Sequence, residues 1–464
     1  MPNRSLKVMA MGIVLSFSLG QLVVSQEKAQ DRGKWLDKKT QVYDDPRQIP
    51  APPIPGGPEG TLVLRGGRLF DGSGAAVREA TVVIERNKIK KVLPPSSADW
   101  PKEARLIEVA GKTILPGLID LHTHLTHYDV GAPIGATLSD ADSTLRGLER
   151  MRYFIESGIT SIRDVASRGD VPFRLKQWVA RNRIPGPRIF AAGQLITATG
   201  GHGAEGMDVH HPLFGMIYEA SGPDDWREAV RLQFKQGADV IKIGSHFSRE
   251  EVKAAVDEAH ALGLKVCADA ETFYIQWAVE AGVDCIEHML PRTDETIRLM
   301  AARGTEAVPT LVVAMYLFDE RGGYYGSTSR RFTWGKEANF EVVRRMKQAG
   351  IKMGVGTDLV SDWWRSLPEP YIMELRQFVK SGYTIPEALM AATKTSAEIL
   401  NMGEKLGTIE PDKLADVLVV DGKPDLNLDD LAKIAMVIRD GYVVVDNGRL
   451  NIPRHISLPP PRAR

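Results

Sequence analysis

The chain has 464 residues, with 59 Lys and Arg against 59 Asp and Glu, so its formal net charge is zero. This balance gives no electrostatic reason to expect a nucleic-acid partner. Hydrophobic residues make up 43% and charged residues 25%, as in ordinary globular proteins, and two cysteines are too few for a disulfide framework.

Residues 1–25 have the composition of an export signal. Arg4 and Lys7 precede an apolar run from Val8 to Val24, and the small Ser25 offers a cleavage point. We therefore expect a signal peptide over 1–25 and a periplasmic or secreted protein with no stable membrane span after signal removal. An uncleaved N-terminal anchor is the alternative.

Short β-strands are expected on both sides of a long central region. Residues 26–60 are polar and then Pro-rich, as in a linker or arm. Alternating apolar positions and Gly turns mark 61–115 and return over 401–455. We expect these two parts to form one small β-sandwich domain built from both chain ends. The tail, 456–464, is expected to be disordered.

The central region, 116–400, alternates apolar strands with amphipathic helices. Ser248 and Glu251, and again Thr384 and Glu387, have the spacing of a helix capping box. This alternation predicts an α/β fold, a (β/α)8 TIM-like barrel, because eight strands are found; a doubly wound sheet is the alternative, but no Gly-rich phosphate loop supports it. The predicted strands are Leu118–His124, Ile159–Asp164, Arg188–Ala191, Val240–Ile243, Lys265–Ala268, Cys285–His288, Glu306–Thr310 and Lys352–Thr357.

Polar side chains occur at the ends of five of these strands. Since a barrel carries its active site at the C-terminal ends of its strands, we expect them to converge. His122 and His124 are two residues apart, which places both rings on one face of a strand and suggests half of a metal site. Pairing of these rings with carboxylates is the plainer interpretation. The other strand ends carry Lys242, Asp269 and Glu271, Glu287 and His288, and Asp358.

The chain resembles the amidohydrolase superfamily, specifically its imidazolonepropionase-like and Xaa-Pro dipeptidase-like branch. The matching segments cover nearly everything after residue 60 and are ILPGLIDLHTHL, TATGGHG, GADVIKI, DEAHALGLKV, EAGVDCIEHM, GVGTD and GTIEPDKLADVLVVD. The resemblance implies a metal-bearing (β/α)8 barrel with a β-sandwich formed by both chain ends.

The resemblance also implies a ligand set. His122, His124 and Asp358 would ligate one divalent metal. A carbamylated Lys242 would bridge to a second ion, bound by a strand-5 residue and His288. Zn²⁺ is favoured, with Mn, Co or Fe as alternatives. The branch usually has His where this chain has Asp269, so one metal or two stays open, and Glu271 is an alternative to Asp269 as the ligand.

The implied activity is hydrolysis of an amide C–N bond by metal-activated water, with Asp358 transferring the proton. Dipeptides, N-acyl amino acids and related small carboxylated amides are the expected substrates. His202, in TGGHG, either contacts the substrate or has a structural role in its loop. The alternatives are a lactone or cyclic-amide hydrolase, a deaminase, or a catalytically silent binding protein with a degraded second metal site. No pattern decides whether the protein forms a homo-oligomer.

Several other residues have plain interpretations. His127, His210, His211 and His246 are expected to be solvated or structural, and His260 to be on the surface or packed. Cys267 and Cys285 are expected to face opposite ways and form no disulfide. Aromatic residues after the seventh and eighth strands either line a pocket or pack; they are Tyr324, Tyr325, Trp363, Trp364 and Tyr371.

Overall fold

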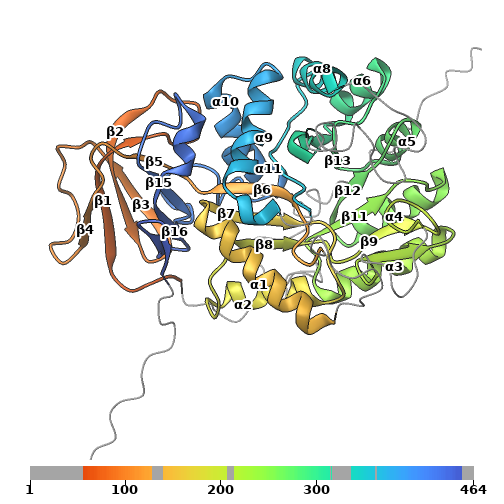
Figure 1. Cartoon of the computed structure of the whole chain (residues 1–464), viewed down its shortest axis with the longest axis horizontal. Helices are drawn as coiled ribbons and strands as arrows, with labels where there is room; N and C mark the ends of the chain where they lie inside the picture. The colour runs from red at the N-terminus through yellow and green to blue at the C-terminus, as the bar shows by residue number, and fades with distance from the viewer. Residues whose placement is uncertain are drawn as a thin grey trace, which may run out of the picture.

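The structure is a computed structural model that describes residues 56–127, 139–205, 214–313, 315, 336–360 and 363–451 (Figure 1). The predicted signal peptide, most of the Pro-rich arm and the tail lie outside these ranges, as do His210, His211, Tyr324 and Tyr325. None of the helices in the described part combines the length and the apolar content that a membrane crossing requires.

One mixed sheet of nine strands is assembled from both ends of the chain. The two halves join where β15 runs antiparallel to β5, and the sheet forms one end of the molecule in Figure 1. Alternate residues of its strands bury an apolar cluster that includes Leu64, Ile84 and Val417. The strands are β1 (Thr61–Leu69), β2 (Arg78–Glu85), β3 (Lys88–Leu93), β4 (Arg105–Glu108), β5 (Thr113–Pro116), β15 (Val417–Val420), β16 (Ile434–Arg439), β17 (Tyr442–Asp446) and β18 (Arg449–Leu450).

The central region contains two parallel sheets. The first, of three strands, has the order β6-β7-β8, and the second, of six strands, has the order β10-β9-β11-β12-β13-β14. Short β9 and β10 were not predicted. The strands are β6 (Leu118–Thr123), β7 (Ile159–Asp164), β8 (Arg188–Ala191), β9 (Leu195–Ala198), β10 (Ile217–Ala220), β11 (Val240–Gly244), β12 (Lys265–Asp269), β13 (Cys285–Glu287) and β14 (Glu306–Val308).

The predicted eighth strand, Lys352–Thr357, is not a strand in the structure. Its backbone makes only isolated bonds with two different neighbours, so no continuous ladder forms. On one side Ala307 N donates to Lys352 O (2.9 Å), and on the other Leu121 N donates to Val355 O (2.8 Å). This segment therefore lies between β14 and β6, one strand from each parallel sheet.

Helices flank these strands on the outside (Figure 1). Both predicted capping boxes are present, at Ser248 with Glu251 and at Thr384 with Glu387, and Gly304 ends α6 in the left-handed conformation. The helices are α1 (Asp140–Glu156), α2 (Val171–Ala180), α3 (Pro223–Gln236), α4 (Arg249–Ala261), α5 (Phe273–Ala281), α6 (Asp294–Arg303), α8 (Lys336–Gln348), α9 (Glu369–Lys380), α10 (Ile385–Met390) and α11 (Ser396–Ile399). Their apolar faces and the strands share one large core.

Candidate metal centre

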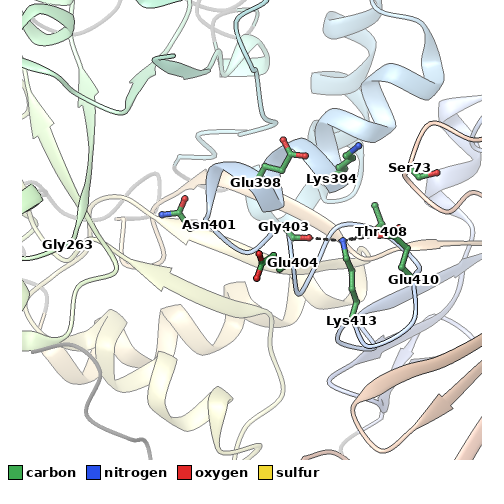
Figure 2. Close-up of a pocket in the computed structure, with 10 residues that line it drawn as sticks. All are labelled: Ser73, Gly263, Lys394, Glu398, Asn401, Gly403, Glu404, Thr408, Glu410 and Lys413. Carbon is green, nitrogen blue, oxygen red and sulfur yellow. Dashed lines mark hydrogen bonds and ion pairs between the residues drawn. The ribbon is translucent and has the colours of Figure 1, made fainter. Parts of the chain in front are cut away.

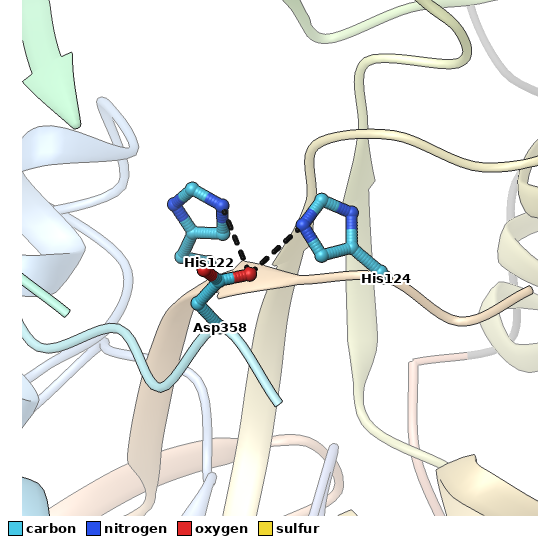
Figure 3. A group of neighbouring side chains, drawn as sticks. All are labelled: His122, His124 and Asp358. Atoms are coloured by element: carbon cyan, nitrogen blue, oxygen red, sulfur yellow. Dashed lines mark ion pairs between the residues drawn. The ribbon is translucent and has the colours of Figure 1, made fainter. Parts of the chain in front are cut away.

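His122, His124 and Asp358 meet at the end of β6 (Figure 3). His124 Nε2 lies 3.1 Å and His122 Nε2 3.5 Å from Asp358 Oδ1. One ligand atom from each residue lies within 4.8 Å of the other two. Imidazole nitrogen and carboxylate oxygen are the donors that Zn²⁺ and similar ions take, so the three side chains could hold one divalent ion.

The backbone explains how residues so far apart in sequence come together. Asp358 N donates to His122 O (2.8 Å), which extends the contact between β6 and the segment that ends at Asp358. The buried carboxylate of Asp120 accepts hydrogen bonds from His122 N (3.1 Å) and Thr357 N (3.0 Å). Asp120 therefore links β6 at His122 to the segment 352–357 at Thr357, the residue before Asp358.

Both rings are oriented through Nδ1. His122 Nδ1 lies 2.7 Å from Glu287 Oε2, and His124 Nδ1 lies 3.1 Å from the carbonyl oxygen of Ala166. A carbonyl oxygen only accepts, so Nδ1 of His124 carries the proton and donates. Each ring therefore directs Nε2, the nitrogen that would bind an ion, toward Asp358.

The protonation states suit metal binding. Burial lowers the pKa of His122 to about 3, and positive Lys242 acts in the same direction, so the ring is neutral at pH 7. Burial alone would raise the pKa of Asp358, yet His122 and His124 hold it below its usual value. A neutral imidazole and an ionised carboxylate are the forms that bind a cation.

A second group surrounds Asp269, at the end of β12. Asp269 Oδ2 lies 3.0 Å from His288 Nε2, 3.2 Å from His202 Nε2 and 3.9 Å from Lys242 Nζ. Burial opposes ionisation of Asp269, but His288, His202 and Lys242 together hold its pKa well below the usual value. His288 is oriented like the first two rings, because its Nδ1 lies 2.6 Å from Thr310 Oγ1.

Lys242 is 2% exposed, and its Nζ has no hydrogen-bond partner among the described residues. A buried ammonium without hydrogen bonds is costly. Such an amine fits a lysine that is carbamylated and faces a bound ion, because a carbamate supplies anionic oxygen donors. The donor set of the second group is thus compatible with a metal ion.

Glu271 points to a different partner. Its Oε1 lies 2.9 Å from His246 Nε2, and the His246 ring meets Tyr274 edge-on at 5.5 Å between centroids. The contact with His288 (3.0 Å) comes from Asp269, at the end of β12.

The sequence pattern of the amidohydrolase family matches residues 113–444. The chain belongs to the amidohydrolase family. The ochratoxinase of Aspergillus niger is 26% identical over 403 residues, covering 78% of this chain and 81% of that protein. An imidazolonepropionase of Geobacillus sp. (strain WCH70) is 26% identical over 415 residues, covering 81% and 92%. A solved prolidase complexed with N-methylphosphonate-L-proline is 30% identical, with a TM-score of 0.73, and covers 83% of this chain and 99% of its own.

Backbone strain in this amidohydrolase is concentrated at the same strand ends. A positive φ is unfavourable for residues other than Gly, and such residues cluster at functional sites. Five of them follow β11, β12, β13, β14 and the segment 352–357, in that order: His246 (φ 82°), Thr272 (49°), His288 (61°), Thr310 (48°) and Asp358 (50°). Of these, only His288 and Asp358 were singled out from the sequence as site residues.

Two further buried residues were not assigned roles from the sequence. Arg163 Nη2 donates to Glu287 Oε1 (2.6 Å). Both side chains are buried, and Glu287 also contacts His122. The signal for Arg163 was an arginine inside the apolar strand ITSIRD. The amidohydrolase thus holds a charged pair beside the candidate metal centre.

Trp364, Tyr371 and His260 have packing roles. Trp364 is buried under the Arg150 guanidinium, 3.5 Å from the ring centroid, and the Tyr371 hydroxyl donates to Ile119 O (2.7 Å). Buried His260 lies 2.9 Å from Asp284 Oδ2.

The predicted opposite orientation of the cysteines is wrong. Cys267 and Cys285 are register partners on the neighbouring parallel strands β12 and β13, so their side chains leave the same face of the sheet. Both thiols are nevertheless free, as expected.

A pocket of 660 Å³ lies away from this centre (Figure 2). It is bounded by Gly263, which precedes β12, and by residues of 394–413, so it lies toward the N-terminal ends of the strands. Lys413 Nζ donates there to Gly403 O (2.7 Å) and Thr408 Oγ1 (2.5 Å). Its ammonium group is thereby engaged by the protein itself.

Proposed function

We propose that this protein is an exported, metal-dependent hydrolase that cleaves the amide C–N bond of small carboxylated substrates, such as dipeptides and N-acyl amino acids. The observation that carries the proposal is the convergence of His122, His124 and Asp358 within 4.8 Å. Membership of the amidohydrolase family and the relatedness to a prolidase and an ochratoxinase support the reaction type.

The proposed architecture is a closed (β/α)8 barrel over 116–400 with a β domain from 61–115 and 401–455, after a signal peptide over 1–25. Two observations support closure of the barrel. The segment that ends at Asp358 hydrogen-bonds to both β14 and β6. Side chains of β6, β7 and β13 also meet at His122, Arg163 and Glu287, although these strands belong to two sheets.

A divalent ion at His122, His124 and Asp358 would supply a Lewis acid that polarises a substrate carbonyl and lowers the pKa of a water molecule. Asp358 would accept the proton of the attacking water and deliver it to the leaving amine. The ionised state of Asp358 and its contacts with both rings support this role. We propose that Asp269, His288 and a carbamylated Lys242 hold a second ion, since the three side chains face one another.

His202 would bind the substrate. Burial alone would lower the pKa of His202, but the charge of Asp269 raises it to about 9, so the ring is cationic at pH 7. An imidazolium beside the centre is suited to a substrate carboxylate or carbonyl oxygen. The loop TGGHG holds this ring against Asp269 at 3.2 Å.

The experiment removes the metal with a chelator, restores Zn²⁺, Mn²⁺ or Co²⁺, and assays a library of dipeptides and N-acyl amino acids. We expect hydrolysis to be lost and then regained. Asp358→Asn should lower kcat by about 10²–10⁴-fold because it removes the proton acceptor, and Asn tolerates the positive φ of this position.

Asp412→Asn is the matched control, since Asp412 is exposed and also has a positive φ (69°). It should retain wild-type activity. A protein that binds no metal and turns over no substrate would contradict the proposed hydrolase activity. Hydrolysis of lactones alone would contradict only the proposed class of amide substrates.

A further inference from the structure

A buried ion pair lies against His122. Arg163, on β7, donates from Nη2 to Glu287 Oε1 (2.6 Å), and Glu287, the last residue of β13, has its Oε2 2.7 Å from His122 Nδ1. Arg163 also donates from Nε to Leu121 O (2.6 Å), the residue before His122. The three side chains are 3%, 0% and 2% exposed.

Such a pair is an expensive way to fill the interior. Desolvation of two charges cancels most of their attraction, and apolar side chains of similar volume often stabilise a core as well or better. Arg163 holds two groups next to His122, the Glu287 carboxylate and the carbonyl oxygen of Leu121. A role in positioning His122 would explain why an ion pair is buried here.

The contact of Glu287 with His122 determines which ring nitrogen is protonated. A carboxylate paired with a guanidinium only accepts hydrogen bonds, so Nδ1 of His122 must donate. In the neutral imidazole, Nε2 is then the nitrogen without a proton, and it is the one that faces Asp358. Arg163 in turn holds the carboxylate, because it occupies Oε1 and leaves Oε2 for the ring.

We propose that Arg163 and Glu287 are positioning residues that fix the tautomer and the orientation of His122, so that the ring binds the metal through Nε2. This inference rests on the proposed metal centre. His124 and His288 are oriented by neutral groups, the Ala166 carbonyl and the Thr310 hydroxyl, so the ion pair acts on His122 alone among these three rings.

Glu287→Gln tests the proposal because an amide has one acceptor where the carboxylate has two. Arg163 can only donate, so the amide oxygen must face Arg163 and the amide NH₂ must face His122. Nδ1 then has to accept, which moves the ring proton to Nε2. We expect the affinity for Co²⁺, measured by competition with a chelator at fixed pH, to fall by about 10–100-fold.

The double variant Arg163→Met/Glu287→Gln makes the test specific. Without Arg163 the amide oxygen can turn to His122 and accept from Nδ1–H. A second substitution should therefore restore Co²⁺ affinity toward the wild-type value, and the absorption spectrum of bound Co²⁺ should recover with it. Removal of the unpaired Arg163 charge would restore stability in a purely structural role as well, so the Co²⁺ affinity and spectrum of the folded protein are the readouts that separate the two roles.

Glu306→Gln is the control. Glu306 is a mostly buried carboxylate on the neighbouring strand β14, and like Glu287 it is paired with a cation, Lys265 Nζ at 2.9 Å. It should leave Co²⁺ affinity unchanged. Wild-type affinity in Glu287→Gln, or a double variant as weak as Glu287→Gln, would overturn the proposal. A wild-type protein that binds no Co²⁺ would instead overturn the proposed function.

Discussion

A single carboxylate oxygen of Asp269 serves three nitrogen groups. His288, His202 and Lys242 all approach Oδ2. A carboxylate can bind Zn²⁺ or Mn²⁺ and also neutralise adjacent cations, which a neutral imidazole cannot do. Asp269 would thus combine a ligand role with control of the charge on His202.

Asp269→Ala should lower the metal content per chain and reduce kcat on the order of 10²-fold, because the second donor set loses its carboxylate. Metal content by elemental analysis and steady-state kinetics measure these effects. Glu271→Ala is the matched comparison: Glu271 lies two residues on but pairs with His246, so this variant should keep its metal. The reverse result would transfer the ligand role to Glu271.

Local spacing made part of the centre predictable. His122 and His124 follow from the two-residue period of a strand, and Asp358 from its place after an apolar segment. Arg163 and Thr310 could not be found in this way, because their roles depend on contacts between residues of different strands that only the folded chain brings together. Strain at His246 is likewise a property of backbone geometry.

At the scale of elements, the segment 352–358 positions Asp358 by close backbone packing. A Cβ at Gly356 would lie 2.8 Å from His122 Cβ and 3.0 Å from His122 N, and would also collide with Val308. Glycine is required here because the segment runs so close to β6. The same proximity keeps Asp358 near the two rings.

Gly356→Ala should therefore push this segment away from β6. We expect kcat/KM to fall by about 10²-fold, the usual effect of a shift of about 1 Å at a reacting group. The free energy of unfolding in urea should fall by about 1–3 kcal/mol. Gly403→Ala is the control, because its nearest neighbour is the flexible Glu398 side chain at 3.1 Å. A folded Gly356→Ala protein with wild-type kcat/KM would disprove this account.

Elements with strong local signals were the predictable ones. The capping boxes of α4 and α10 form as expected because they involve residues three apart. The segment 352–357 was predicted as a strand from its apolar residues, yet its bonds are shared between two neighbours. The unpredicted β9, LITA, has only four residues and shows no alternation of apolar and polar positions.

At the scale of the whole molecule, Arg188 connects the central region to the nine-stranded sheet. From the start of β8 its guanidinium binds Asp416 (2.8 and 3.0 Å) and Asp440 (2.8 Å). Burial raises the pKa of Asp440, but Arg188, together with Arg439 and Asn87, holds it below the usual value. Asp416 and Asp440 have side chains only 3% and 8% exposed.

Arg188→Met should lower the free energy of unfolding by about 3–5 kcal/mol at pH 7, because two buried carboxylates lose their cation. In the wild type, the stability from the depressed pKa of Asp440 is present above the unfolded pKa and lost as pH falls through the folded pKa. In the variant the buried Asp440 carboxylate loses the charge of Arg188, so its folded pKa rises and acid removes less stability. The difference between the two proteins should shrink from pH 7 to pH 4 in urea unfolding.

Arg183→Met is the control, because Arg183 is exposed and lies between α2 and β8. Its difference in unfolding free energy from the wild type should not change with pH. An equal loss of stability at pH 7 and pH 4 in Arg188→Met would contradict the electrostatic explanation.

Alternating apolar positions predicted β-strands near both chain ends. The pairing of β5 with β15 could not be predicted, because the whole central region separates these two strands in the sequence.

That pairing has a consequence for synthesis. The ribosome delivers β5 long before β15, and domains generally begin to fold as they emerge. Until β15 arrives, β5 exposes a row of unpaired backbone groups, which is an edge that other chains can join. The nascent chain therefore leaves this edge of β5 uncovered until β15, far downstream in the sequence, has been made.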